Sequence, residues 1–242
     1  MDTSPAVRAD NLSKAYGRNW ALRGVDLEVG AGERVALLGA NGAGKSTLMR
    51  LVATLTRPTR GALRVCGLDA VRQTREVRRM IGVVAHRPYL YEDLTARENL
   101  EFYARLYGIA GSSAQYGPLL EMAGLTRAAD SHVRTYSRGM QQRLALVRSL
   151  LHDPKVLLLD EPETGLDQEA LRLLETVVRS PDSSRTVLFS THNHDLGLRL
   201  ADRVVVLAGG AVAYDAHAGA VDASRFRDVY AELAGAHAVG KA

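Results

Sequence analysis

A glycine-rich loop near the start of the chain has the residue types and spacing of a phosphate-binding site. Residues 39–46 match the pattern G-x-x-x-x-G-K-[ST]. Glycine has no Cβ, so successive backbone N–H groups can turn toward one ligand, and a following helix adds the positive end of its dipole. The lysine can reach the β- and γ-phosphates, and the serine hydroxyl can bind Mg²⁺. The residues expected to hold a nucleoside triphosphate are Gly39, Ala40, Asn41, Gly42, Ala43, Gly44, Lys45, Ser46 and Thr47.

The segments on either side of this loop fit that interpretation. Residues 34–38 form an apolar run typical of a buried strand. Residues 46–55 place apolar side chains at helical spacing, namely Leu48, Leu51, Val52 and Leu55. A strand, a glycine loop and a helix in this order are the context that the phosphate-loop motif requires.

Two acidic residues follow a second apolar run. The four apolar residues before Asp160 are typical of a central parallel strand that is buried on both faces, and Glu161 comes next. Open α/β sheets bind ligands at the carboxyl ends of their strands. We therefore expect Asp160 to hold Mg²⁺ and Glu161 to act as the base for an attacking water, while Lys45 offsets phosphate charge.

Composition limits the class of protein. The 242 residues are 46% hydrophobic and 24% charged, as in ordinary globular proteins. No apolar stretch approaches 18 residues and the N-terminus lacks a secretory pattern, so the chain by itself is expected in the cytosol. The single Cys66 excludes an internal disulfide. A run of basic residues at helical spacing is interpreted as a solvated helix face rather than a nucleic-acid site; it consists of Arg72, Arg75, Arg78 and Arg79.

Residues 136–143 resemble the signature motif of ABC-type ATPases. Ser137 is a suitable N-cap for a helix, and Gly139 would let a ligand approach the backbone. In that family the signature binds the γ-phosphate of an ATP held by the opposite subunit, so the resemblance implies this role for Ser137, Arg138 and Gly139. The chain departs from the family pattern at Arg138 and at Met140.

Other positions match the same family. Tyr16 resembles the aromatic residue that stacks on adenine. Residues 164–167, ending in Asp167, are similar to the loop that contacts the partner subunit. His192 follows a β-branched and aromatic run and resembles the switch histidine that contacts the γ-phosphate.

One family position differs. The loop that joins the two lobes normally carries a Gln, and His86 occupies that place here. A neutral imidazole can either ligate Mg²⁺ or hydrogen-bond a water, and it titrates near neutrality. We expect His86 to take over the coupling role, as a candidate metal ligand.

The resemblance implies an α/β fold: a phosphate-loop NTPase core with a mainly parallel sheet, an N-terminal antiparallel β subdomain and an inserted helical subdomain. It predicts one domain over 1–242, with the core at about 1–90 and 150–220, the helical subdomain at 91–149 and a C-terminal helix at 222–236. Residues 208–220 are interpreted as a loop. Two copies of the chain would enclose two ATP and drive a separate integral membrane permease subunit, at the cytoplasmic face of the membrane and without nucleic acid.

The predicted helical insertion begins with a capping box. Thr95 and Glu98 have the S/T-x-x-E spacing, and Gly108 should end the helix whose face carries Leu100, Tyr103, Leu106 and Tyr107. Tyr89, Leu90 and Tyr91 either line the groove for a membrane-subunit helix or are simply core residues.

Several alternatives remain open at this level. His86, residues 91–108 and residues 150–154 together resemble the ATPase of the bacterial haem exporter of cytochrome c maturation. Drug- or lipid-exporting ATPases of the same branch are the alternative. A soluble ABC ATPase without a transport role would share the nucleotide motifs. A phosphate-loop GTPase or kinase is a third class, although the Asn-Lys-x-Asp guanine motif is absent.

Overall fold

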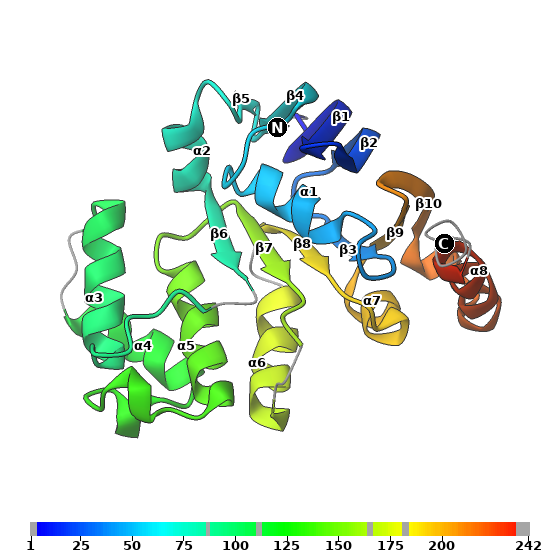
Figure 1. Cartoon of the computed structure of the whole chain (residues 1–242). Helices are drawn as coiled ribbons and strands as arrows, with labels where there is room; N and C mark the ends of the chain where they lie inside the picture. The colour runs from blue at the N-terminus through cyan, green and yellow to red at the C-terminus, as the bar shows by residue number, and fades with distance from the viewer. Residues whose placement is uncertain (1–3, 86–87, 110–112, 164–166, 181–183, 236–242) are drawn as a thin grey trace.

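The chain contains an antiparallel sheet and a larger, mainly parallel sheet (Figure 1). The computed structural model describes residues 4–85, 88–109, 113–163, 167–180 and 184–235. In this part the antiparallel sheet has the order β2-β1-β4-β5, and the larger sheet has the order β10-β9-β3-β8-β7-β6. The strands are β1 (Val7–Tyr16), β2 (Asn19–Val29), β3 (Arg34–Leu38), β4 (Arg60–Val65), β5 (Leu68–Asp69), β6 (Ile81–Val84), β7 (Val156–Asp160), β8 (Thr186–Ser190), β9 (Arg203–Ala208) and β10 (Ala211–His217).

The helices cover both faces of the larger sheet. They are α1 (Lys45–Val52), α2 (Thr74–Met80), α3 (Ala96–Tyr107), α4 (Ser113–Met122), α5 (Arg138–Leu150), α6 (Gln168–Val178), α7 (His194–Leu200) and α8 (Ala223–Gly235), with one-turn 3₁₀ helices η1 (Thr126–Ala128), η2 (Val133–Thr135) and η3 (Ala218–Ala220). Helices α3, α4 and α5 lie together beyond β6, and α8 lies at the other end of the molecule (Figure 1). No helix in the described ranges is long and apolar enough to span a bilayer.

The central strands are apolar on both sides because each side of the larger sheet is covered. Leu158 of β7 belongs to a core shared with α1 and the antiparallel sheet, while its neighbours Leu157 and Leu159 belong to a core shared with α5, α6 and α7. Successive strand residues point to opposite faces, so one strand contributes to two cores. The prediction of a buried strand ending at Asp160 is confirmed.

The fold class predicted above is confirmed: an antiparallel N-terminal sheet stands beside a second sheet that is parallel except for the β9–β10 pair. The capping box at the start of α3 is present, with the Thr95 hydroxyl accepting from Glu98 N and the Glu98 carboxylate accepting from Thr95 N. Gly108 ends the helix with φ 72°. The boundaries predicted for a helical subdomain remain a prediction.

Three local predictions were wrong. Residues 208–220 contain strand β10, which pairs with β9 through a turn at Gly209 and Gly210, both with positive φ. Alanine has a low strand propensity, so pairing with β9 and not local sequence makes this strand. Helix α1 stops at Val52, which leaves Leu55 48% exposed, and Leu106 of α3 is 66% exposed rather than packed.

Candidate functional site

The phosphate loop joins β3 to α1 in a conformation that requires glycine. Gly39, Gly42 and Gly44 have φ values of 146°, 80° and 111°, where side chains are rarely accommodated. A Cβ on Gly39 would collide with the carbonyl oxygen of Leu207, and one on Gly44 would lie 2.7 Å from the carbonyl oxygen of Ala21. The neighbouring strands therefore fix the path of the loop.

Lys45 is folded back over this loop. Its side chain is only 4% exposed, and its Nζ donates hydrogen bonds to the carbonyl oxygens of Gly39 at 2.7 Å and Ala40 at 3.3 Å. The same Nζ lies 3.8 Å from Oε1 of Glu161. A buried ammonium needs such partners, because an unpaired charge away from water is costly. The structure thus brings together two of the residues that the sequence assigns to catalysis.

Asp160 connects the phosphate loop to the neighbouring strand. Ser46 Oγ donates to Asp160 Oδ1 at 3.1 Å, and Ser190 Oγ donates to the same oxygen at 2.6 Å. Asp160 and Ser190 are register partners at the carboxyl ends of β7 and β8. A hydroxyl and a carboxylate at this edge are oxygen ligands of the kind that Mg²⁺ prefers, and phosphate oxygens and water would complete the shell.

Glu161 sits on an unusual backbone. Its φ is 50°, in the left-handed region that non-glycine residues seldom occupy. The conformation is held by its N–H, which donates to Ser190 Oγ at 2.9 Å and to the Ser190 carbonyl at 3.2 Å. Observed strain of this kind is common at functional sites. Here the Asp160 and Glu161 side chains point in different directions, and the Glu161 carboxylate faces Lys45.

Glu163 is a residue that sequence reasoning missed. Thr191 Oγ1 donates to its Oε1, whereas its buried Oε2 has no hydrogen-bond partner among the described residues. Burial raises the pKa of the Glu163 carboxyl, and the Thr191 bond and nearby His192 partly oppose that rise. Nothing in the sequence distinguishes this partly buried acid from an exposed loop acid, because its contact with Thr191 depends on where β8 ends.

His192 lies directly after β8, beside this group. The residue is exposed, and it stands between Thr191 and Asn193, whose side chain caps α7 by accepting from Leu196 N. The Thr191 hydroxyl in turn accepts from Asn193 N at 2.9 Å. These bonds fix the backbone on both sides of His192, so the imidazole is presented at the same sheet edge as Asp160 and Glu161.

Among the described residues, the predicted adenine and signature residues form no recorded hydrogen bond or ion pair with this cluster. Tyr16 is 47% exposed at the end of β1, with Lys14 Nζ 5.0 Å from its ring centroid. Ser137 caps α5, as predicted, by accepting from Met140 N at 3.2 Å. In the described part of the chain, no hydrogen bond or ion pair joins residues 137–139 to residues 39–47. His86 and residues 164–166 lie outside the described residues.

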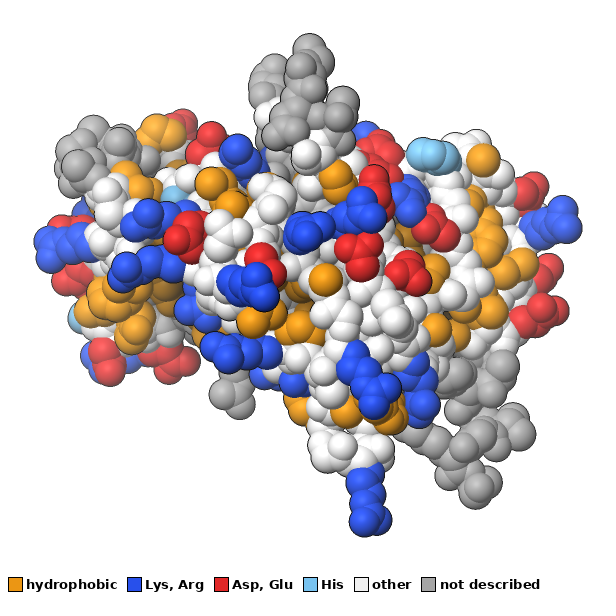
Figure 2. Space-filling model, turned by 90° about the horizontal axis from the view of Figure 1, so that it is seen from above, with side chains coloured by type: hydrophobic (Ala, Val, Ile, Leu, Met, Phe, Trp, Pro, Cys, Tyr) orange, Lys and Arg blue, Asp and Glu red, His pale blue; other side chains and the backbone are white. Residues whose placement is uncertain are grey.

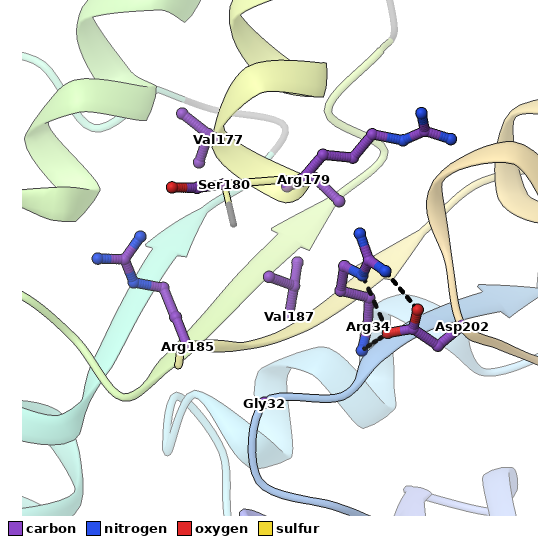
Figure 3. Close-up of a pocket in the computed structure, with 9 residues that line it drawn as sticks. Gly32, Arg34, Val177, Arg179, Ser180, Arg185, Val187 and Asp202 are labelled. Carbon is purple, nitrogen blue, oxygen red and sulfur yellow. Dashed lines mark hydrogen bonds and ion pairs between the residues drawn. The ribbon is translucent and has the colours of Figure 1, made fainter. Parts of the chain in front are cut away.

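A cavity of about 330 Å³ lies at the opposite ends of the strands (Figure 3). Arg34 at the start of β3 forms hydrogen bonds to both carboxylate oxygens of Asp202, and Arg179 and Arg185 also line the space. Ligands of open α/β sheets bind at the carboxyl ends of the strands. This cavity is therefore separate from the phosphate-loop site.

Comparison with known proteins gives the class that this fold and site define. The family model "ABC transporter" matches residues 22–164. The chain is 42% identical over 236 residues to the daunorubicin resistance ATP-binding protein DrrA2 of Streptomyces coeruleorubidus, covering 95% of this chain and 73% of that protein. It is 39% identical over 208 residues to the Nod factor export ATP-binding protein I of Paraburkholderia xenovorans, covering 85% and 68%.

Solved structures agree. The chain is similar to an ATP-binding subunit of an ABC transporter, with TM-score 0.81, 32% identity and coverage of 97% and 96%. It is also similar to a dimeric ATP-binding cassette in a post-hydrolysis state bound to ADP and phosphate, with TM-score 0.78, 29% identity and coverage of 88% and 98%. The chain belongs to the ABC transporter family and is an ABC ATPase. This assignment rejects the GTPase and kinase alternative.

Proposed function

We propose that this chain is the ATP-hydrolysing subunit of an ABC exporter, working at the cytoplasmic face of a membrane with a separate permease subunit. One observation supports the assignment of ATP hydrolysis: consecutive residues of the phosphate loop contact consecutive acids at the end of β7. Ser46 Oγ lies 3.1 Å from Asp160 Oδ1, and Lys45 Nζ lies 3.8 Å from Glu161 Oε1. The exporter part is supported by the names of the two relatives given above, which concern export and drug resistance.

The chemistry assigned to these residues is an in-line attack of water on the γ-phosphate. Ser46 and Asp160 would hold Mg²⁺, which supplies charge neutralisation at the phosphate oxygens when bound. Lys45 leaves its carbonyl partners to pair with phosphate, and Glu161 accepts the proton of the water. His192 contacts the γ-phosphate, and Tyr16 supplies a face for adenine.

The site is proposed to be completed by a second copy of the chain. Ser137, Arg138 and Gly139 would contact the γ-phosphate held by the partner's phosphate loop, and Asp167 would face the partner. This arrangement is supported by the lack of any hydrogen bond or ion pair between residues 137–139 and residues 39–47 in the described part of one chain, and by the dimeric state of the similar cassette. His86 is proposed to act in coupling to the permease.

The cargo is proposed to be a drug-like or lipid-like molecule. The daunorubicin resistance relative supports a drug-like cargo, and the Nod factor relative supports export. These relatives do not support the haem-exporter prediction. A soluble ABC ATPase without a permease is the competing function, and co-purification tests it. Recovery of the chain with an integral membrane protein is expected, whereas recovery with ribosomes or DNA would reject the transport role.

The experiment for the catalytic assignment is Glu161→Gln. The variant should bind ATP and form the dimer, because the amide keeps the shape of the side chain, but its kcat should fall by about 10³-fold without the base. Glu121→Gln, an exposed change on α4, is the matched control and should keep the parent rate. A fully active Glu161→Gln variant would reject Glu161 as the base.

A further inference from the structure

One stretch of the chain accounts for its positive charge. Residues 50–79 contain eight arginines but only two acids, Asp69 and Glu76. The whole chain has 31 Lys and Arg against 27 Asp and Glu, so the rest of the chain has 23 basic and 25 acidic residues. The net charge of +4 therefore arises from this stretch alone. The eight arginines are Arg50, Arg57, Arg60, Arg64, Arg72, Arg75, Arg78 and Arg79.

The fold directs these side chains outward. In β4, Leu63 and Val65 are buried while Arg64 is exposed on the alternate face. In α2, Val77 is the buried residue, so Arg75 and Arg79, one turn apart, lie on the face away from the core. Figure 2 looks down on this side of the molecule and shows many Lys and Arg side chains at the surface, with Asp and Glu side chains among them.

The positive charge is not neutralised by ion pairs. None of the ion pairs recorded among the described residues includes any of these eight arginines, whereas Arg34, Arg97 and Arg203 elsewhere in the chain each pair with an aspartate. The carboxylate of Asp69 accepts hydrogen bonds from the backbone N–H groups of Val71 and Arg72. It therefore caps a turn and forms no ion pair with an arginine side chain among the described residues, although the charges of Arg72 and Arg64 help these backbone bonds to lower the pKa of its carboxyl.

Two of the eight arginines have roles within the fold. Arg78 donates from Nε to Thr54 Oγ1 at 2.9 Å and from Nη2 to the Thr54 carbonyl at 3.1 Å, which ties α2 to the end of α1. Arg60 lies over the Trp20 ring at 5.3 Å. In contrast, Arg72, Arg75 and Arg79 are exposed, and no hydrogen bond of their guanidinium groups is recorded in the described ranges. These three residues are the arginine surface.

The chemistry around the arginine surface favours lipid over nucleic acid. Residues 50–79 contain no aromatic residue or histidine, so the stretch offers no ring on which a base could stack. It does offer Leu55, an apolar side chain 48% exposed at the end of α1. Thr54, the neighbour of Leu55, is bonded by Arg78 of α2, so this leucine and the arginine surface lie on adjoining elements. Exposed arginines without ion pairs and an exposed leucine suit an interface of anionic headgroups and acyl chains.

We propose that the arginine surface binds the headgroups of anionic phospholipids. This inference rests on the proposed function only in that the permease brings the chain to a membrane. Helix α2 continues directly into β6, which leads toward the exposed Tyr89 and Tyr91. Lipid contact at α2 would therefore restrain the helix that leads, through β6, to the predicted permease groove.

Vesicle binding by the isolated chain tests the proposal. The chain is mixed with phosphatidylcholine vesicles containing phosphatidylglycerol, or with pure phosphatidylcholine vesicles, and bound protein is measured by flotation at low and high salt. The parent should bind only the anionic vesicles and should dissociate at high salt, because headgroup attraction is screened. Removing each arginine should weaken binding about fivefold, so the triple variant R72Q/R75Q/R79Q should bind about 100-fold more weakly.

A matched variant separates the arginine surface from net charge. R127Q/R172Q/R225Q removes three exposed arginines from other elements and has the same net charge as the test variant. It should bind vesicles within about twofold of the parent, and both variants should keep parental ATPase rates. Two results would overturn the proposal: equal binding of the parent to anionic and uncharged vesicles, or an equal loss of vesicle affinity in the two triple variants. A third would be release of the chain from the vesicles by single-stranded RNA at a concentration below that of the anionic lipid. Such a result leaves the transport role intact, since the permease is absent from this experiment.

Discussion

The backbone of Gly139 lies directly against the carboxylate of Asp167. A Cβ on Gly139 would clash with Asp167 Oδ2 and would stand 2.8 Å from Asp167 Cγ. The same carboxylate caps α6 by accepting from Ala170 N at 2.7 Å. The first turn of α5 and the N-cap of α6 are therefore packed together within one chain. This contact gives Gly139 a structural requirement in addition to its proposed approach to a γ-phosphate.

Gly139→Ala should consequently destabilise the chain as well as slow ATP hydrolysis. The new methyl group must displace Asp167, which weakens the α6 cap, at a cost of about 1–2 kcal/mol in the free energy of unfolding. Thermal or urea unfolding measures the stability change. ATPase assays measure the rate, which should fall at least tenfold if the α5 start also faces a partner's phosphate.

A second substitution identifies the source of that instability. Serine at position 167 can still cap α6, but its hydroxyl is shorter than a carboxylate and frees the space beside position 139. The double variant G139A/D167S should therefore be more stable than G139A alone, while D167S alone should remain close to the parent. If the double variant is no more stable than G139A, the clash with Asp167 is not the cause.

Glu163 predicts a pH-dependent change in stability. Burial raises the pKa of its carboxyl, so the folded chain retains a proton that the unfolded chain releases above about pH 4.3. The stabilising contribution is complete below that pH and is lost as the pH rises through the folded pKa. Glu163→Gln cannot ionise, so at pH 8 it should be more stable than the parent. Urea unfolding at pH 4.5, 6.5 and 8 measures the difference, which should shrink toward the acid end.

For His152 we expect the opposite pH dependence, a loss of stability as the pH falls. Its ring stacks on Tyr107 at 3.8 Å, its Nε2 bonds the Ile81 carbonyl at 2.9 Å, and its buried Nδ1 has no partner among the described residues. Burial lowers the pKa of this imidazole, and Arg148 and Arg185 add to the effect. Stability is therefore present above about pH 6.5 and lost as the pH falls toward the folded pKa.

The variant His152→Phe keeps an aromatic ring on Tyr107 but cannot be protonated. Its stability at neutral pH should fall by about 1 kcal/mol, because the bond to the Ile81 carbonyl is lost. Between pH 7 and pH 5 its stability should decline less than that of the parent. Urea unfolding at several pH values measures the decline in stability. An identical decline in both proteins would show that His152 does not cause the loss of stability at acid pH.

The sequence predicted the parts of the site that local patterns determine. Residues 39–46 follow a strand and open a helix, and Ser46 meets Asp160 because the carboxyl ends of parallel strands share one edge. Contacts that depend on packing between distant segments were not predictable. Thr191 bonds Glu163 and Gly139 abuts Asp167 because whole elements pack together, and neither pair has a spacing that a motif could record.

The C-terminal helix α8 provides the last prediction. Tyr230 of α8 lies 5.9 Å from the His194 ring, measured between centroids, and Arg227 pairs with Asp195 at 3.6 Å. Burial raises the pKa of the Tyr230 hydroxyl, and its interaction with the Gly39 backbone partly offsets that rise. Tyr230 therefore touches both the start of the phosphate loop and the helix that follows His192.

Tyr230→Phe should raise KM for ATP about fivefold while kcat stays within about twofold, because it removes the interaction of the hydroxyl with the Gly39 backbone but keeps the ring against His194. Tyr214→Phe is the matched control, since the Tyr214 ring packs on Phe226 of the same helix at 5.4 Å and has no recorded contact with the phosphate loop. An equal rise in KM in both variants would mean that α8 acts only through general packing. A change confined to Tyr230→Phe, with an unaltered melting temperature, would identify its hydroxyl as a positioning group for Gly39.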